Sequence, residues 1–213
     1  MLTPALAPTA LARRRPWLLR LLAAMREPPP STGRASSSAH GAARGEPLRL
    51  LEFERFFLEH EARVSGFLWR MTGDRQAACD LSQETFLRAW QRFEQISAYE
   101  RPDAWLIHVA TNLALQHLRR RRAPVGAAVS LDEAFDPGVS DPGQRFPLRD
   151  LVRETLLGLP PRDRALLALR EVYGLSGEET AAALGMTPNA AKVALFRARE
   201  RFRAAYLEKD GPR

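Results

Sequence analysis

Two closely spaced helix-start signals near the C-terminus constrain the fold of this chain more than any other feature. Ser176 and Glu179 have the spacing of a capping box, and Thr187 precedes Pro188, which is a hydroxyl cap followed by proline at the first helical position. Gly185 lies between the two signals, where it ends the first helix. Two helices joined by a short glycine-containing turn predict a helix-turn-helix.

The second helix of this motif separates its side chains by the helical period. Its inward face carries Ala191, Leu195, Ala198 and Phe202. The opposite face combines polar, cationic and apolar side chains that we interpret as contacts in a DNA major groove, namely Asn189, Lys192, Val193, Phe196 and Arg197. An apolar ring there can meet a thymine methyl group while the cations meet phosphates or guanine. The alternative is an ordinary amphipathic helix with Phe196 buried against a neighbour.

Helical periodicity also dominates the rest of the chain, and we find neither a strand signal nor an internal repeat. A first helix is predicted from about Leu48, because apolar residues follow at steps of three and four: Leu50, Phe53, Phe57, Val64, Phe67, Leu68 and Met71. Gly73 and Asp74 end that helix and can cap a second one over about 75–95. The inward stripe of this second helix is Ala78, Ser82, Ala89 and Phe93. A polar loop, 97–101, then precedes a third helix over about 103–122.

Composition divides the chain into two small helical domains with unstructured segments around them. Residues 1–47 are rich in Ala, Pro, Ser, Gly and Arg, so we expect a disordered leader. We expect a three-helix domain over 48–122, a linker with dense turn signals over 123–147, a helix-turn-helix domain over 148–207 and a tail over 208–213. The predicted fold class is therefore all-α, with two small domains joined by a flexible linker.

Charge and cysteine content restrict the classes of function. The formal net charge of +7 favours a polyanionic partner, either nucleic acid or an acidic membrane surface. Cys79 is the only cysteine in the sequence, which excludes an internal disulfide and a thiolate zinc site. The sequence has no triad-like arrangement, glycine-rich phosphate loop or Glu-x-x-His pattern. We therefore expect no catalytic residues, no cofactor, no metal and a cytoplasmic location.

The N-terminal segment has a second interpretation. Arginines 13–15 precede an apolar stretch over 17–22, as in a signal sequence, but Arg20 interrupts that stretch and no cleavage site follows. We favour a disordered leader or a start codon assigned too early, with Met25 as a second start. A membrane-surface protein that uses residues 13–25 as an amphipathic anchor is an alternative.

The third helix of the first domain carries a polar stripe beside its apolar face. Steps of three and four residues align Trp105, His108, Asn112, Gln116 and Arg119, and Arg120 belongs to the arginine run that closes the helix. Amides can pair with base edges, arginines with phosphates and an aromatic ring with an unstacked base. The stripe as a whole predicts a nucleic-acid surface, although Trp105 by itself fits the core better.

The second helix carries a different kind of surface opposite its inward stripe. Acidic, amide and large apolar side chains share it, namely Asp80, Gln83, Glu84 and Leu87, with Trp90 at its border. Carboxylates repel phosphate, whereas exposed apolar side chains among polar groups are typical of protein interfaces. This face therefore predicts a protein partner.

Together these segments resemble the extracytoplasmic-function (ECF) subfamily of the sigma-70 family of bacterial RNA polymerase sigma factors. The stretch 73–86 and the segments 104–106 and 110–112 resemble the family's region two. Leu159, Pro160, Arg164 and the segments 174–176, 178–179 and 197–199 resemble its region four. Two motif sets in the right order, with a linker between them, make the resemblance specific.

The resemblance implies a division of labour in promoter-specific transcription initiation. The helix with Asp80, Gln83 and Glu84 would bind the clamp of core RNA polymerase. The loop from Ser97 to Asp103, which includes Tyr99, and the Asn112 stripe would open and read the minus-ten element, holding a flipped base. The last helix would read the minus-thirty-five element. The family also implies an anti-sigma partner, no small-molecule substrate and a monomeric free protein.

The chain departs from the family pattern at two places that matter. Residues 190–194 read Ala-Ala-Lys-Val-Ala where Thr-Val-Lys-Ser-Arg is common, so its promoter preference does not follow from its relatives. Thr180 replaces a usual isoleucine. The alternative function is a conventional helix-turn-helix regulator that does not dock on polymerase. Such regulators usually dimerise on two half-sites, and the first domain would then have no role.

Overall fold

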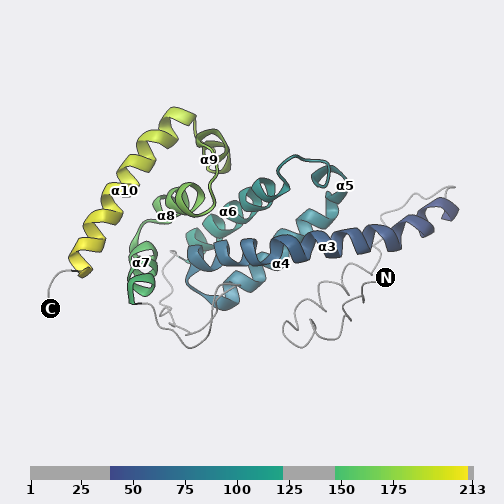
Figure 1. Cartoon of the computed structure of the whole chain (residues 1–213), viewed down its shortest axis with the longest axis horizontal. Helices are drawn as coiled ribbons and strands as arrows, with labels where there is room; N and C mark the ends of the chain where they lie inside the picture. The colour runs from purple at the N-terminus through teal and green to yellow at the C-terminus, as the bar shows by residue number, and fades with distance from the viewer. Residues whose placement is uncertain (1–38, 122–146, 211–213) are drawn as a thin grey trace, which may run out of the picture. The chain divides into compact units, whose positions relative to one another are not determined.

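The computed structural model describes residues 39–121 and 147–210, with side chains from residue 48 in the first segment and from residue 148 in the second. Every regular element in these two segments is a helix, as the sequence predicts (Figure 1). The expected linker, except for Pro147, and residues 1–38 of the expected leader lie outside the described residues. The chain divides into two compact units, residues 1–53 and 54–213.

Helix α3 (Ala39–Thr72) begins earlier than the sequence predicts. We expected a start near Leu48, where the apolar face begins, because the residues before it offer little to bury. Alanine and arginine are nevertheless good helix formers, so the helix can begin before the periodic apolar residues that start near Leu48. Leu48 and Leu51, near the end of the first unit, are exposed, whereas Phe53, the last residue of that unit, is buried.

In the second unit, α3 is followed by α4 (Arg75–Gln91), α5 (Phe93–Ile96) and α6 (Pro102–Arg121). Gly73 ends α3 with a positive φ of 69°, a conformation that glycine adopts without strain. Asp74 then caps α4, because its carboxylate accepts a hydrogen bond of 3.1 Å from the Ala77 N–H. The predicted second helix is in fact two helices, since Arg92 leaves the helical conformation with φ −122° and ψ 20°.

The predicted core of this helical group is confirmed. Phe57 packs edge-on against Phe86 with ring centroids 4.6 Å apart, and Phe56 packs likewise against Phe93 at 5.5 Å. The predicted inward residues of the second helix are all buried, and so are those of α3 beyond Leu50: Phe53, Phe57, Val64, Phe67, Leu68, Met71, Ala78, Ser82, Ala89 and Phe93. Each buried aromatic or branched side chain contributes about 1.5–3 kcal/mol, so this periodic face explains the packing.

The C-terminal part of the second unit contains α7 (Pro147–Gly158), α8 (Pro161–Leu167), a π-helical turn η1 (Ala168–Val172), α9 (Gly177–Ala183) and α10 (Pro188–Asp210). Pro161 stands at the first position of α8, where its missing N–H has no helical partner to lose. Leu166, Leu169 and Leu175 are fully buried and form the centre of this part. The π-helical turn was not predicted from the sequence.

Candidate nucleic-acid and protein interfaces

The helix-turn-helix predicted from the sequence is present. The Glu179 N–H donates to the Ser176 hydroxyl at 3.0 Å, and the Ser176 N–H donates to the Glu179 carboxylate at 2.6 Å, so both halves of the capping box form. Gly185 turns the chain after α9 with φ 61°. The Thr187 hydroxyl accepts a hydrogen bond of 3.3 Å from the Ala190 N–H at the start of α10.

Helix α10 presents the predicted recognition face to solvent. The five predicted DNA-contact residues are all exposed: Asn189, Lys192, Val193, Phe196 and Arg197. Phe196 is 65% exposed, which excludes burial against a neighbour within the described chain. Ala191 and Ala198 are buried on the other side of the helix, whereas Leu195 and Phe202 are half-buried.

The cations of α10 differ in their pairing within the described residues: Arg199, Arg201 and Lys209 pair with carboxylates, whereas Lys192, Arg197 and Arg203 do not. Arg199 pairs with Glu171 at 2.6 Å, and Arg201 pairs with Asp163 at 2.5 Å, so these two arginines hold α10 to the preceding helices. Lys192 and Arg197 make no ion pair with any residue that the structure describes. The positive charge on the recognition face is therefore available to an external anion.

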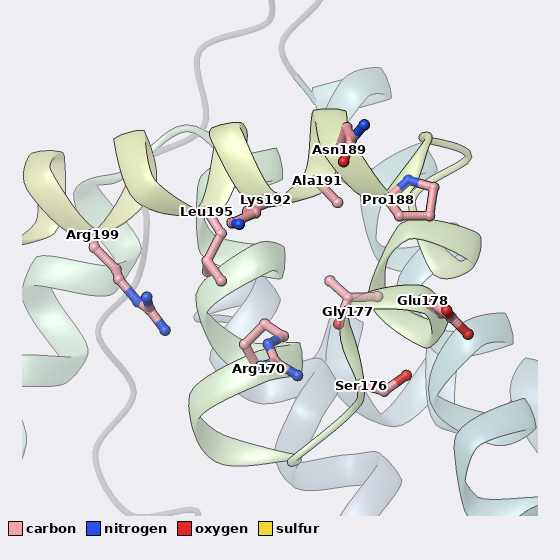
Figure 2. A pocket seen from close by; sticks show the side chains of 11 residues that line it. Arg170, Ser176, Gly177, Glu178, Pro188, Asn189, Ala191, Lys192, Leu195 and Arg199 are labelled. Carbon is pink, nitrogen blue, oxygen red and sulfur yellow. The ribbon is translucent and has the colours of Figure 1, made fainter.

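A cleft of about 580 Å³ lies between the two helices of the motif, where Figure 2 shows Lys192, Leu195 and Arg199 of α10 across from Arg170 and Ser176. Its apolar walls include Ala191 and Leu195, and Thr180 of α9 also lines it. Thr180 is only 1% exposed, and its hydroxyl has no hydrogen-bond partner among the described residues.

The polar stripe of α6 is partly confirmed in its exposure. Asn112, Arg119 and Arg120 are exposed, whereas Trp105, His108 and Gln116 are half-buried. Beside it, Leu106, Ala110 and Leu113 of the apolar face are buried. Trp105 therefore lies between core and surface and does not belong fully to either.

The side chains in and beside the polar stripe differ in charge and in pairing. Burial lowers the pKa of His108 from its ordinary value of 6.5, so its ring is neutral at pH 7 and offers hydrogen bonds without charge. Arg121 pairs with Asp74 at 3.0 Å. Arg119 and Arg120 pair with no carboxylate in the described segments, and they supply the cationic end of the stripe.

The polar loop predicted before the third helix consists of turns and bends from Ser97 to Glu100, followed by Arg101. Ser97 and Tyr99 are exposed, and the Tyr99 side chain retains 48% of its accessible surface. Arg101, which sequence reasoning did not single out, pairs with Asp103 at 3.3 Å and with Glu179 of α9 at 2.6 Å. No local pattern could have revealed the second pair, because its partners are far apart in sequence.

The outer face of α4 is more covered than the sequence predicts. Asp80 is exposed, but Gln83, Glu84, Leu87 and Trp90 are half-buried. The expectation that Leu87 and Trp90 are exposed was wrong, because α4 packs against both α5 and α6 and its border positions lose surface. Glu84 pairs with Arg88 at 2.8 Å, and Asp80 accepts a hydrogen bond of 2.9 Å from Gln76.

The described residues contain neither a metal-binding cluster nor a membrane-spanning helix. Within 39–121 and 147–210, no group of three or more His, Cys, Asp or Glu side chains could hold a metal ion. The same residues contain no helix that is long and apolar enough to cross a membrane. The proposed membrane anchor over 13–25 and the second start at Met25 lie outside the described residues.

The fold and these surfaces define a helical DNA-binding protein that joins a helix-turn-helix domain to a second helical domain. Family models identify both parts: Sigma-70 region 2 matches residues 56–123, and Sigma-70 region 4 matches residues 149–202. The chain belongs to the sigma-70 family of RNA polymerase sigma factors, in its ECF subfamily. The region 2 match favours this function over a conventional helix-turn-helix regulator.

Curated relatives agree over most of their length. The chain is 35% identical to RNA polymerase sigma factor CarQ of Myxococcus xanthus over 152 residues, which cover 71% of this chain and 87% of CarQ. It is 31% identical to the RNA polymerase sigma-H factor of Pseudomonas aeruginosa, covering 70% of this chain and 82% of that protein.

Solved structures show the same fold. The sigma factor RpoE of Bartonella quintana, crystallised with the anti-sigma factor NepR, matches with a TM-score of 0.58 at 22% identity, covering 72% of this chain and 96% of RpoE. CnrH, in complex with the cytosolic domain of CnrY, matches with a TM-score of 0.51 at 23% identity, covering 75% of this chain and 89% of CnrH.

Proposed function

We propose that this sigma factor distributes its work over three surfaces and performs no bond chemistry of its own. In this proposal the region 2 domain spans 48–122 and the region 4 domain spans 148–207, joined by the linker 123–147. The outer face of α4 binds core polymerase, α6 and its preceding loop read the minus-ten element, and α10 reads the minus-thirty-five element. Binding, base stacking and phosphate contacts then supply the energy for strand opening.

The observation that carries the proposal is an exposed aromatic ring beside unpaired cations on α10. Lys192 and Arg197 have no ion-pair partner within the described residues and flank the exposed ring of Phe196, whereas Arg199 and Arg201 of the same helix are paired. A solvated helix has no need of this arrangement, because an exposed ring costs free energy in water. A major groove offers partners to all three side chains.

The minus-ten surface is supported by the chemistry of the loop before α6 and of side chains along the helix. Tyr99, exposed before the helix, offers a ring on which an unstacked base can stack, and Asn112 offers an amide to a base edge. Arg119 and Arg120 offer cations to the DNA backbone. The remaining proposed contacts are Ser97, Trp105, His108 and Gln116.

The α4 surface is assigned to polymerase because its carboxylates repel DNA and its half-buried apolar groups suit a protein. We further propose a cytoplasmic location and a monomeric free state. We also propose control by an anti-sigma factor, because the similar sigma factor RpoE of Bartonella quintana was crystallised with the anti-sigma factor NepR.

Recruitment of core polymerase tests the proposal. The double variant Gln83→Lys and Glu84→Lys reverses the character of the α4 face and should abolish capture of core enzyme and specific transcription. The control Glu59→Lys and Gln95→Lys makes the same charge change at two exposed positions outside all three surfaces and should leave both activities intact. Unchanged recruitment by the α4 variant would refute the assignment of this face.

A further inference from the structure

A hollow of about 530 Å³ lies beside the recognition face of α10. Its apolar lining comes from Met186, Ala190, Val193 and Ala194. The cleft in Figure 2, which Lys192 lines, is on the other side of this face, because the helical period separates the two sets of α10 side chains. The recognition face therefore borders a cationic cleft on one side and a partly apolar hollow on the other.

The polar side chains of the hollow differ in their availability to a ligand. Asp163 and Arg201 pair with each other at 2.5 Å, so their charges are already compensated. Asn189 and Arg197 make no side-chain hydrogen bond or ion pair with another residue in the described segments. They lie four residues before and after Val193, about one helical turn in each direction, so the three side chains share one face. A ligand on this face therefore meets Val193 between an available amide and an available guanidinium.

Val193 is exposed although it is apolar. Its side chain retains 51% of its accessible surface, and Ala190 beside it is exposed as well. Neither side chain can form a hydrogen bond, so neither can bind the donors and acceptors that base pairs present in the major groove. The C5 methyl group of thymine is the one alkyl group on that side of a base pair, and it suits such a surface. This part of α10 therefore has the chemistry to distinguish thymine from the other bases.

We propose that Val193 selects a thymine methyl group of the minus-thirty-five element, which enters the hollow between Asn189 and Arg197. The inference rests on the proposed function of α10 and names the chemical group that this helix selects. The amide of Asn189 suits an adenine at the same step, because asparagine pairs with the N6 and N7 atoms of adenine. The element must therefore contain at least one A·T pair whose methyl group faces α10.

Uracil in place of thymine tests the contact, because it removes only the methyl group and keeps the base pair. Each thymine of the minus-thirty-five element, on both strands, is replaced singly by uracil in the promoter located by transcript mapping. Competition binding then measures the affinity of holoenzyme for each DNA. We expect at least one position at which uracil weakens binding about fourfold, the factor that corresponds to one buried methyl group. A uracil in the spacer between the two elements is the control and should have no effect.

The variant Val193→Ala assigns the methyl contact to its residue. Its holoenzyme should bind the thymine and uracil promoters equally well at the sensitive position, because the apolar partner of the methyl group is gone. Leu207→Ala, at an exposed position of the same helix outside the recognition face, should keep the fourfold difference. Capture of core polymerase by both variants shows that each is folded. A uracil effect of the same size in Val193→Ala and in the unsubstituted protein would overturn the proposal.

The variant Arg197→Ala distinguishes failure of this inference from failure of the proposed function. If α10 reads the element, loss of this available cation weakens binding to it whether or not a methyl group is selected. Weaker binding by Arg197→Ala without a uracil effect at any position, or with an element that has no A·T pair, overturns the methyl contact and leaves the role of α10 intact. If neither the substitution nor uracil changes binding, the proposed role of α10 is wrong, and the methyl contact is wrong with it.

Discussion

Ser176 and Glu179 cap each other at the start of α9: each backbone N–H is bound by the other residue's side chain, at 2.6 and 3.0 Å. Four N–H groups at a helix start lack helical partners, and this pair satisfies two of them. The same Glu179 carboxylate also pairs with Arg101. One side chain thus stabilises the fold of the helix-turn-helix and its contact with region 2.

Removal of the cap should destabilise the region 4 part. We expect Ser176→Ala to lower the free energy of unfolding by about 1 kcal/mol, because the Glu179 N–H loses its acceptor. Urea unfolding followed by circular dichroism measures this change. Glu178→Ala, at the neighbouring exposed position outside the box, is the control and should have little effect. Equal stability of Ser176→Ala and the unsubstituted chain would contradict the role of the cap.

Thr180→Val should stabilise the protein, which is the reverse of most core substitutions. The Thr180 hydroxyl is buried without a hydrogen-bond partner among the described residues, and a buried unsatisfied polar group costs about 1–3 kcal/mol. Valine has the same shape and no such group. Thr155→Val is the matched control, since Thr155 is equally buried but donates a 2.7 Å bond to the Leu151 carbonyl. In thermal unfolding, Thr180→Val should raise the stability and Thr155→Val should lower it. A loss of stability in Thr180→Val would contradict this prediction.

Arg164→Met should be strongly destabilising. The substitution keeps much of the side-chain length but removes every donor to the ends of α3 and α7, so buried carbonyls lose their partners. We expect a loss of about 2–4 kcal/mol in the free energy of unfolding. Arg162→Met, at an exposed position of the same helix, should change it by less than about 0.5 kcal/mol. Chemical denaturation with matched m-values distinguishes the two variants.

Local signals in the sequence account for most of the fold. The capping box at Ser176, the glycine turns at Gly73 and Gly185 and the inward stripe of α4 all act within a few residues, and each was predicted correctly. The break at Arg92 and the start of α3 were not, because neither carries a strong stop or start signal. Helix ends without such signals depend on packing, which the local pattern does not contain.

The candidate sites were only partly predictable for a related reason. Exposure of Phe196 follows from the period of α10, whereas the half-burial of Leu87 depends on neighbouring helices. The pairs Arg63–Tyr173 and Arg101–Glu179 join residues that are far apart in the chain. The sequence does not show whether an arginine on a helix surface pairs with a carboxylate or faces only solvent. The tertiary structure is needed to distinguish the two cases.

Lowering the pH should reveal how much Asp74 contributes to the stability of the folded protein. The hydrogen bond from the Ala77 N–H, helped by Arg121, lowers the pKa of Asp74 from its ordinary value of 3.8. A carboxyl group with a lowered folded pKa contributes stability above its unfolded value, and this contribution is lost as the pH falls through the folded value. Asp74→Asn still caps α4 but does not titrate. Below pH 3.8 its free energy of unfolding should fall less steeply than that of the unsubstituted chain. Asp150→Asn serves as the control and should keep the steep fall.

Phe196 provides the most direct test of promoter reading by α10. It is 65% exposed and lies beside Lys192 and Arg197, so its removal leaves the fold intact and takes away only an external contact. Leu207 is 58% exposed on the same helix but outside the recognition face, which makes Leu207→Ala the matched control.

We expect Phe196→Ala holoenzyme to bind its minus-thirty-five element about tenfold more weakly, or ~1.4 kcal/mol, because the ring no longer covers a base edge or methyl group. Because this contact reads a base, the loss should be larger on the cognate element than on a scrambled one. Removal of a phosphate contact would instead weaken both equally. Competition binding with the two DNAs separates these cases, and equal affinity of Phe196→Ala and Leu207→Ala for the cognate element would remove Phe196 from the recognition surface.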